Sequence, residues 1–125
     1  MIVGVGTDIV AVARLGSLYA RHGERALNRI LSPQERAEFA GVRDPARFLA
    51  KRFAAKEALG KALGIGLAAP ATLPSIGVAH DARGRPLFEY APALASHLAQ
   101  RRLVAHLSIS DENDYAVAFV IMEQS

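Results

Sequence analysis

The fold is decided by the stretch Phe48-Leu49-Ala50-Lys51-Arg52-Phe53-Ala54-Ala55-Lys56-Glu57-Ala58-Leu59-Gly60-Lys61-Ala62-Leu63-Gly64, which predicts one long helix. Asp44-Pro45 supplies an N-cap followed by proline at the first helical position, where a missing N–H costs nothing. Gly64 is typical of a left-handed C-cap. We therefore expect about 18 helical residues spanning roughly 27 Å. The apolar face of this helix comprises Phe48, Leu49, Phe53, Ala55, Leu59 and Leu63.

Glu57 is the unusual residue of this helix. At helical spacing its carboxylate lies among an aromatic ring and small side chains, which let another group approach closely. We expect positive charge to surround it, from Lys51, Arg52, Lys56 and Lys61. Taken alone, the helix favours an exposed Glu57–Lys61 pair at i,i+4 over a functional carboxylate.

Length and composition indicate a single domain, residues 1–125, with 51% hydrophobic residues and therefore a globular fold. The lack of cysteine excludes a disulfide scaffold and thiol chemistry, and fits a reducing compartment. No basic region opens the chain, so we expect no signal peptide and a cytoplasmic protein. Residues 62–79 carry no charge, but Pro70 and Pro74 would break a membrane helix there. That segment is predicted to be a loop leading into a strand, with no membrane partner.

The net charge of +3 is unevenly distributed. Residues 1–62 hold eleven Lys and Arg against six Asp and Glu, whereas residues 63–125 hold four against six. A basic half indicates an acidic partner: nucleic acid, a phosphate ligand or an acidic protein. Aromatic residues make up only 6% of the chain and do not alternate with basic ones, which disfavours nucleic acid.

The N-terminal half predicts a strand over 1–9 and helices over 10–22, 23–30 and 32–41. Thr7-Asp8 is expected to end the strand, where Asp8 either binds a ligand or caps the next helix. Arginines recur on the first two helices, as a solvated face or as a surface for an acidic partner; the charge split favours the partner. Ser32-Pro33-Gln34-Glu35 is a capping box, to which we assign no chemistry.

The C-terminal half predicts two hairpins separated by a helix over 91–102. The first hairpin pairs 75–80 with 86–90, and the second pairs 103–110 with 115–122. His106 lies on the second hairpin, where a lone histidine is most often structural. The predicted fold class is α+β, with an N-terminal strand, a helical middle and a mostly antiparallel sheet.

Three segments carry a resemblance to a known family: Ile2-Val3-Gly4-Val5-Gly6-Thr7-Asp8-Ile9, residues 48–58, and His106-Leu107-Ser108-Ile109-Ser110. Together they resemble the holo-acyl-carrier-protein synthases, the small homotrimeric class of 4′-phosphopantetheinyl transferases. The similarity covers nearly the whole chain in the same order and spacing. Its Arg-Phe-Ala-Ala-Lys-Glu-Ala block is highly specific.

The resemblance implies an enzyme of fatty acid biosynthesis that acts as a homotrimer, with active sites between neighbouring copies. It would move 4′-phosphopantetheine from coenzyme A to a serine of an acidic acyl carrier protein and release adenosine 3′,5′-bisphosphate. Asp8 and Glu57 are implied as magnesium ligands, which reverses the interpretation of Glu57 as an exposed ion pair. Two carboxylates without a histidine or cysteine cluster favour Mg²⁺ or Mn²⁺ over zinc. Glu57 and Lys61 would be the catalytic residues, the lysine near the phosphates.

The resemblance also implies binding residues. Those for coenzyme A are Arg52, Phe53, Lys61, Gly64, Gly66, Pro86 and His106; those for the carrier protein are Arg14, Arg21 and Arg25. The nucleophile is the carrier's serine, and its proton would go to a metal-held water or to a carboxylate.

Two residues depart from the family pattern: Asp111 replaces a histidine that follows Ser-x-Ser in many relatives, and Gly60 stands where serine is common. Other functions remain as alternatives. One is a nucleic-acid binder or a scaffold without turnover. Another is a different magnesium-dependent nucleotide enzyme, which the lack of a P-loop disfavours.

Overall fold

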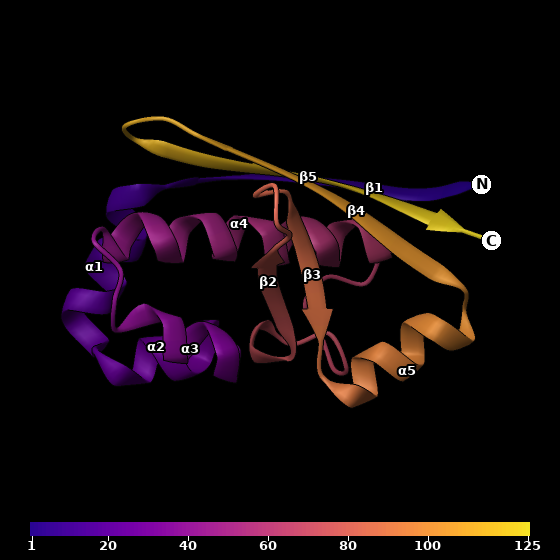
Figure 1. Ribbon diagram of the computed structural model, residues 1–125, viewed down its shortest axis with the longest axis horizontal. Coiled ribbons are helices and arrows are strands. Elements are labelled where there is room, and N and C mark those ends of the chain that lie inside the picture. Colours follow the sequence, from indigo (N-terminus) through magenta and orange to yellow (C-terminus); the bar gives the residue numbers. More distant parts are fainter.

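The computed structural model describes residues 1–125, and α4 (Pro45–Leu63) runs through its centre (Figure 1). The predicted ends of this helix are confirmed. The Asp44 side chain accepts a hydrogen bond from the Arg47 backbone N–H at 3.2 Å, and Gly64 has a left-handed φ of 84°. The helix is buried on more sides than the predicted apolar face, since its alanines at 50, 54, 58 and 62 are buried as well. Small side chains on these positions let other elements approach the helix axis.

A three-stranded antiparallel sheet covers one side of α4, in the order β1 (Ile2–Ala11), β5 (Tyr115–Gln124), β4 (Leu103–Asp111). Strand β1 contacts the helix most closely. A Cβ atom on Gly4 or Gly6 would lie 2.0 Å from the carbonyl oxygen of Ala62 or Ala58, respectively. Glycine is therefore required at both positions, because any side chain would push the strand off the helix.

The prediction that β1 ends at Thr7-Asp8 is wrong. The strand continues to Ala11, and Asp8 pairs with Ala118 within the β1–β5 ladder. Helix α1 (Val12–His22) begins after Ala11, without any side-chain cap. Asp8 is therefore neither at a strand end nor a helix cap. The partner strand β5 extends β1 past the local end signal, which a reading of β1 alone could not foresee.

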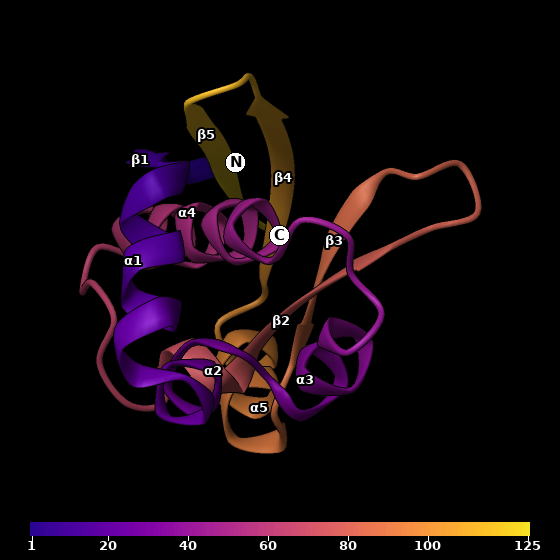
Figure 2. The same ribbon diagram turned by 90° about the vertical axis from the view of Figure 1, so that its left-hand side faces the viewer.

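Helices α1, α2 (Glu24–Ile30) and α3 (Pro33–Phe39) cover a second side of α4 (Figure 2). The residues between α4 and the next strand form a loop and a short 3-10 turn, η1 (Leu73–Ser75), as expected. The strands β2 (Ile76–His80) and β3 (Pro86–Tyr90) form a separate two-stranded sheet, whose turn end projects from the body in Figure 2. Helix α5 (Pro92–Gln100) buries Leu94 and Leu98. The α+β class is confirmed, with two antiparallel sheets, and no helix has the length and apolar character to cross a bilayer.

The face of the three-stranded sheet that points away from α4, here the outer sheet face, is uncovered in the single chain. Its side chains alternate with the buried ones along each strand, as the pleat requires. Several are large and apolar, and Ile9 is 62% exposed. The exposed apolar members include Val3, Val5, Ile9, Val104, Tyr115 and Phe119.

Candidate active site

Asp8, Glu57 and Lys61 meet where β1 crosses α4. Gly4, Gly6 and Asp8 share the inner face of β1, so the glycine contacts with Ala62 and Ala58 bring Asp8 onto the preceding turn of the helix. The Lys61 ammonium donates hydrogen bonds to the Asp8 carboxylate at 3.2 Å and to the Thr7 carbonyl at 2.9 Å. The sequence contains a signal for this close crossing: glycines at alternate positions of the strand, and alanines four positions apart on the helix.

The pKa of Glu57 depends on the charged groups around it. Burial raises the pKa of the Glu57 carboxyl, and the Asp8 carboxylate raises it further, while the charges of Lys61 and Arg14 act in the opposite direction. The exposed Glu57–Lys61 pair favoured by helical spacing does not form, because Lys61 bonds to Asp8 instead. Two carboxylates thus repel each other beside a single ammonium.

This donor set fits a hard divalent cation. Mg²⁺ takes one or two protein carboxylates, with waters and substrate phosphate oxygens completing its shell, and a dication would relieve the repulsion between Asp8 and Glu57. Nowhere do three or more histidine, cysteine or acidic side chains gather into a closed metal cage. The pair of carboxylates suits magnesium or manganese better than zinc.

Lys56 does not contribute to the positive charge expected around Glu57. It is fully buried on another face of α4, where its ammonium donates to the Glu35 carboxylate at 2.6 Å. Burial lowers the pKa of Lys56 to about 8, although the charge of Glu35 opposes this. The expectation that Lys56 adds positive charge beside Glu57 is wrong. The predicted capping box is confirmed, and its Glu35 also forms this buried ion pair. The two residues are 21 positions apart, so no local spacing indicated the pair.

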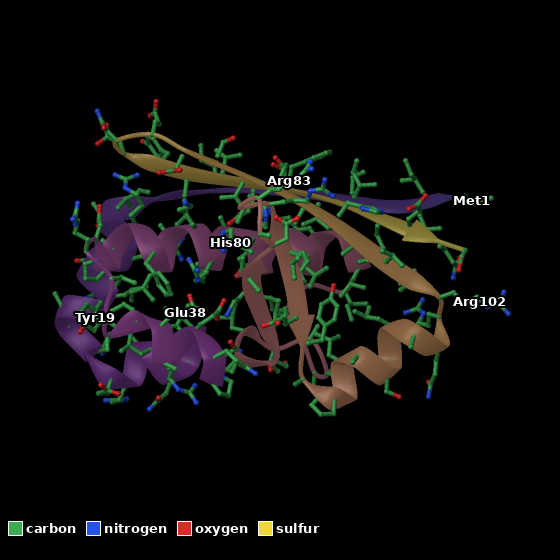
Figure 3. All side chains as sticks on the ribbon, in the orientation of Figure 1. Met1, Tyr19, Glu38, His80, Arg83 and Arg102 are labelled. Carbon is green, nitrogen blue, oxygen red and sulfur yellow. The ribbon has the colours of Figure 1, made fainter.

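Arg52 also faces away from Asp8. Its guanidinium lies 3.6 Å from the centre of the Phe48 ring, and its Nε atom is buried without a hydrogen-bond partner. Burial lowers the pKa of His80, with a further contribution from the charge of Arg52, which places the turn end of the β2–β3 hairpin near this arginine. Pro86 pairs with His80 at the same end. Figure 3 shows His80 and Arg83 on this hairpin, in front of α4.

A cavity of about 300 Å³ opens between α1, α2 and α4. Arginine and histidine side chains border it, and its remaining lining is apolar. Phe53 lies in this cavity, 5.4 Å from the guanidinium of Arg14, and so on the side of the arginines rather than with Arg52. Arg25 lines it from α2, whereas Arg21 is exposed on α1 outside the lining. We call it the arginine pocket; it is lined by Arg14, Leu18, His22, Arg25, Ala26, Arg29, Ile30, Phe53 and Leu73.

The glycines after α4 form a tight backbone contact. The Gly66 N–H donates to the Gly60 carbonyl at 3.1 Å, and Gly64 and Gly66 both have positive φ. A Cβ atom at Gly60 would lie 2.9 Å from the Gly66 carbonyl carbon. A serine at position 60 would therefore displace the loop, which explains the glycine found in this chain.

His106 lies on the outer sheet face, where its Nε2 atom is 2.8 Å from the Glu123 carboxylate. The hydrogen bond and charge of His106 lower the pKa of Glu123. Asp8 points to the inner face, so one copy of the chain does not bring His106 to the carboxylate pair. Asp111, the other departure from the family pattern, accepts a hydrogen bond from Arg47 at 3.0 Å and ties the end of β4 to α4.

Comparisons with known proteins identify the family of this chain. The holo-[acyl-carrier-protein] synthase of Azoarcus sp. (strain BH72) is 59% identical over 123 residues, which cover 98% of each chain. That of Dechloromonas aromatica (strain RCB) is 58% identical over the full length of both chains. The crystal structure of the Neisseria meningitidis holo-[acyl-carrier-protein] synthase matches with a TM-score of 0.96 and 45% identity, covering 99% of this chain and 100% of that one.

A second solved structure contains a ligand. The holo-(acyl-carrier-protein) synthase from Bacillus anthracis, in complex with CoA (3′,5′-ADP), matches with a TM-score of 0.84 and 35% identity, covering 100% of this chain and 99% of that one. The family model described as the 4′-phosphopantetheinyl transferase superfamily matches residues 4–120. The chain therefore belongs to the 4′-phosphopantetheinyl transferase superfamily, among its holo-[acyl-carrier-protein] synthases.

Proposed function

We propose that this protein transfers the 4′-phosphopantetheine group from coenzyme A to a serine of an apo acyl carrier protein, in fatty acid biosynthesis. The serine oxygen forms a bond to the phosphorus that carries the pantetheine, the phosphoanhydride bond breaks, and adenosine 3′,5′-bisphosphate leaves. The relatives' names and the coenzyme A complex of the Bacillus anthracis enzyme support the substrates. Within this chain, the meeting of Asp8 and Glu57 at the β1–α4 crossing carries the proposal.

The residues at the crossing have distinct tasks in this reaction. Asp8 and Glu57 would hold Mg²⁺, with Mn²⁺ as a substitute, and the bound ion would neutralise charge on the pyrophosphate. The Lys61 side chain is 54% exposed and long enough to leave Asp8 for a phosphate oxygen. There its positive charge would stabilise the departing bisphosphate. The serine proton would pass to water or to the carboxylate pair.

The arginine pocket suits an acidic carrier protein. Arg14 and Arg25 border it, Arg21 lies nearby on α1, and the apolar lining offers contacts that a nucleic-acid backbone could not use. Charge attraction of this kind speeds association and weakens as salt is added. We accordingly assign these three arginines to carrier docking. Phe53 lines the same pocket, so we assign it to carrier docking as well as to the coenzyme A binding implied by the resemblance.

We propose a homotrimer as the working form. The outer sheet face exposes a group of large apolar side chains that a neighbouring copy would cover. His106 lies on that face, so it would reach coenzyme A bound at a neighbour's carboxylate pair. Arg52, Pro86 and the glycines at 64 and 66 would hold the remainder of the coenzyme. A cysteine-free chain suits the reducing cytoplasm, where we place the activity.

Mass spectrometry of a carrier protein tests the proposed function. Incubation of the apo carrier with coenzyme A, Mg²⁺ and this protein should add the mass of phosphopantetheine to the carrier. EDTA should abolish the gain, and excess Mg²⁺ should restore it. An unchanged carrier mass under all conditions would contradict the proposal.

A further inference from the structure

Lys56 joins three separate segments to α4. Its ammonium is fully buried and donates to the Glu35 carboxylate at 2.6 Å, to the Ile30 carbonyl at 2.6 Å and to the Leu73 carbonyl at 3.1 Å. An ammonium has three donors, and each has a partner within the protein. Lys56 therefore has no donor left for a substrate, and any part that it plays in the reaction is indirect.

Glu35 extends these contacts to two further elements. Its Oε1 atom accepts a hydrogen bond from the Ser32 N–H at 2.9 Å, at the start of α3. Its Oε2 atom accepts one from the Val78 N–H at 2.8 Å, in β2. The Lys56–Glu35 pair thus fixes α2, α3, η1 and β2 against one turn of α4. Hydrogen bonds to backbone groups are directional, so they fix the orientation of each segment relative to α4.

The same turn of α4 connects the two halves of the proposed site. Ile30 and Leu73, whose carbonyls bond to Lys56, both line the arginine pocket. Phe53 lines it too, from the preceding turn of α4, and Glu57 directly follows Lys56 in the sequence. The buried pair therefore lies between the surface assigned to the carrier protein and the carboxylate assigned to the metal.

We propose that Lys56 and Glu35 are positioning residues, which hold the arginine pocket at a fixed distance and angle from Glu57 so that the serine of a docked carrier meets the coenzyme A phosphorus. This inference rests on the proposed function. Reacting atoms must approach to about 3–3.5 Å, and a misplacement of about 1 Å lowers the rate by about a hundredfold. Walls of the pocket that shift relative to α4 would impair transfer to the carrier and leave coenzyme A binding intact.

Two variants test the pair. Lys56→Met keeps an unbranched side chain of similar length but leaves the buried Glu35 carboxylate with the Arg52 guanidinium, whose Nε lies 3.7 Å from Oε2, as its only remaining counter-charge. Lys56→Met with Glu35→Gln removes both charges and so avoids a buried carboxylate that has lost its ammonium partner. With Mg²⁺ present, we expect kcat/KM for the carrier to fall by about tenfold or more in both variants. In Lys56→Met, which keeps Glu35 beside Arg52, the Kd for coenzyme A measured by calorimetry without carrier should stay within about twofold of the wild type.

A matched control separates positioning from stability. Leu98→Ala creates a cavity in α5, away from the pocket, and should lower the melting temperature without changing kcat/KM for the carrier. All proteins are assayed at a temperature at which circular dichroism shows them folded. An equal loss of carrier transfer in Leu98→Ala would overturn the inference, and so would wild-type kcat/KM in the double variant. A loss of coenzyme A affinity in Lys56→Met that matches its loss of carrier transfer, or a double variant that does not fold, would also overturn it. Absence of transfer in the wild type would instead contradict the proposed function itself.

Discussion

Two of the lysine–carboxylate pairs on helix α4, Lys56–Glu35 and Lys61–Asp8, consist of the same chemical groups and differ in their surroundings. In the Lys56–Glu35 pair the side chains are 0% and 1% exposed, and every ammonium donor is bonded within the protein. In the Lys61–Asp8 pair they are 54% and 19% exposed, and a second carboxylate, Glu57, lies close by. The first pair has no capacity left for a ligand, whereas the second can exchange its partner for a cation or a phosphate. Burial, rather than residue type, separates the structural pair from the functional one.

The two pairs should also differ in energetics. A buried ion pair is strongly destabilising when only one partner is removed, because an uncompensated charge stays inside the protein. An exposed pair contributes little to stability, since water solvates either partner alone. Single substitutions at the two pairs should therefore differ in their effect on stability: a large loss at the buried pair and little change at the exposed pair.

The largest effect is expected from breaking the buried pair. Glu35→Gln leaves the Lys56 ammonium without its counter-charge and should lower the free energy of unfolding by about 3–5 kcal/mol. Urea denaturation followed by circular dichroism measures this. A loss below about 1 kcal/mol, the size typical of an exposed pair, would remove the contrast between the two sites.

Glu57→Gln should show the reverse behaviour. The substitution removes a carboxylate from the proposed magnesium site, so the transfer rate should fall by about 10²–10³-fold, as when one group aimed at developing charge is deleted. The urea midpoint should change little, because Glu57 is only partly buried. Wild-type turnover of this variant in the mass-spectrometric assay would contradict the metal assignment.

Lys61→Met tests the part that the exposed pair plays in the reaction. We expect about a tenfold lower kcat, equivalent to about 1.4 kcal/mol, because a positive charge near the leaving group is lost. Stability should change by less than about 1 kcal/mol. Lys51→Met is the matched control: this lysine is also on α4, but it lies 3.8 Å from Asp111 and away from the carboxylate pair, so its kcat should stay at the wild-type value. Equal rates for the two variants would show that Lys61 has no special part.

The smallest effect that we expect is on the stability of the protein at alkaline pH, where another buried group, Tyr90, contributes. Burial raises the pKa of Tyr90 to about 12. In the unfolded chain this tyrosine loses its proton near pH 10, so the folded state binds more protons between these values, and stability falls as pH rises from about 10 towards 12. Tyr90→Phe should flatten the fall by about 1 kcal/mol in urea titrations at pH 9.5 and 11. An unchanged slope would mean that the buried hydroxyl is not responsible.

What the sequence predicted correctly is mostly local. The caps at Asp44 and Gly64 and the capping box at Ser32 depend on residues within one helical turn, and the structure confirms them. The end of β1 was missed because its length is set by pairing with β5, whose residues lie more than a hundred positions away. The Lys56–Glu35 pair and the placement of His106 on the outer sheet face likewise depend on tertiary contacts.

The grouping of Asp8, Glu57 and Lys61 came from the resemblance to a family, since helical spacing alone favoured an exposed Glu57–Lys61 pair. The glycines at 4 and 6 opposite alanines at 58 and 62 were sufficient to suggest the close crossing. They did not reveal which lysine would bond to Asp8, because that depends on which face of α4 the strand covers.

The proposed reaction depends on one cation shared by two carboxylates. Anomalous diffraction from crystals grown with Mn²⁺ and coenzyme A locates that ion without assumptions about the protein. We expect a single anomalous peak, at a position where a manganese ion would be bound by an oxygen of Asp8, an oxygen of Glu57 and the coenzyme A pyrophosphate. The Lys61 ammonium should no longer be hydrogen-bonded to Asp8. A manganese ion bound elsewhere, or held by only one of these carboxylates, would contradict the account.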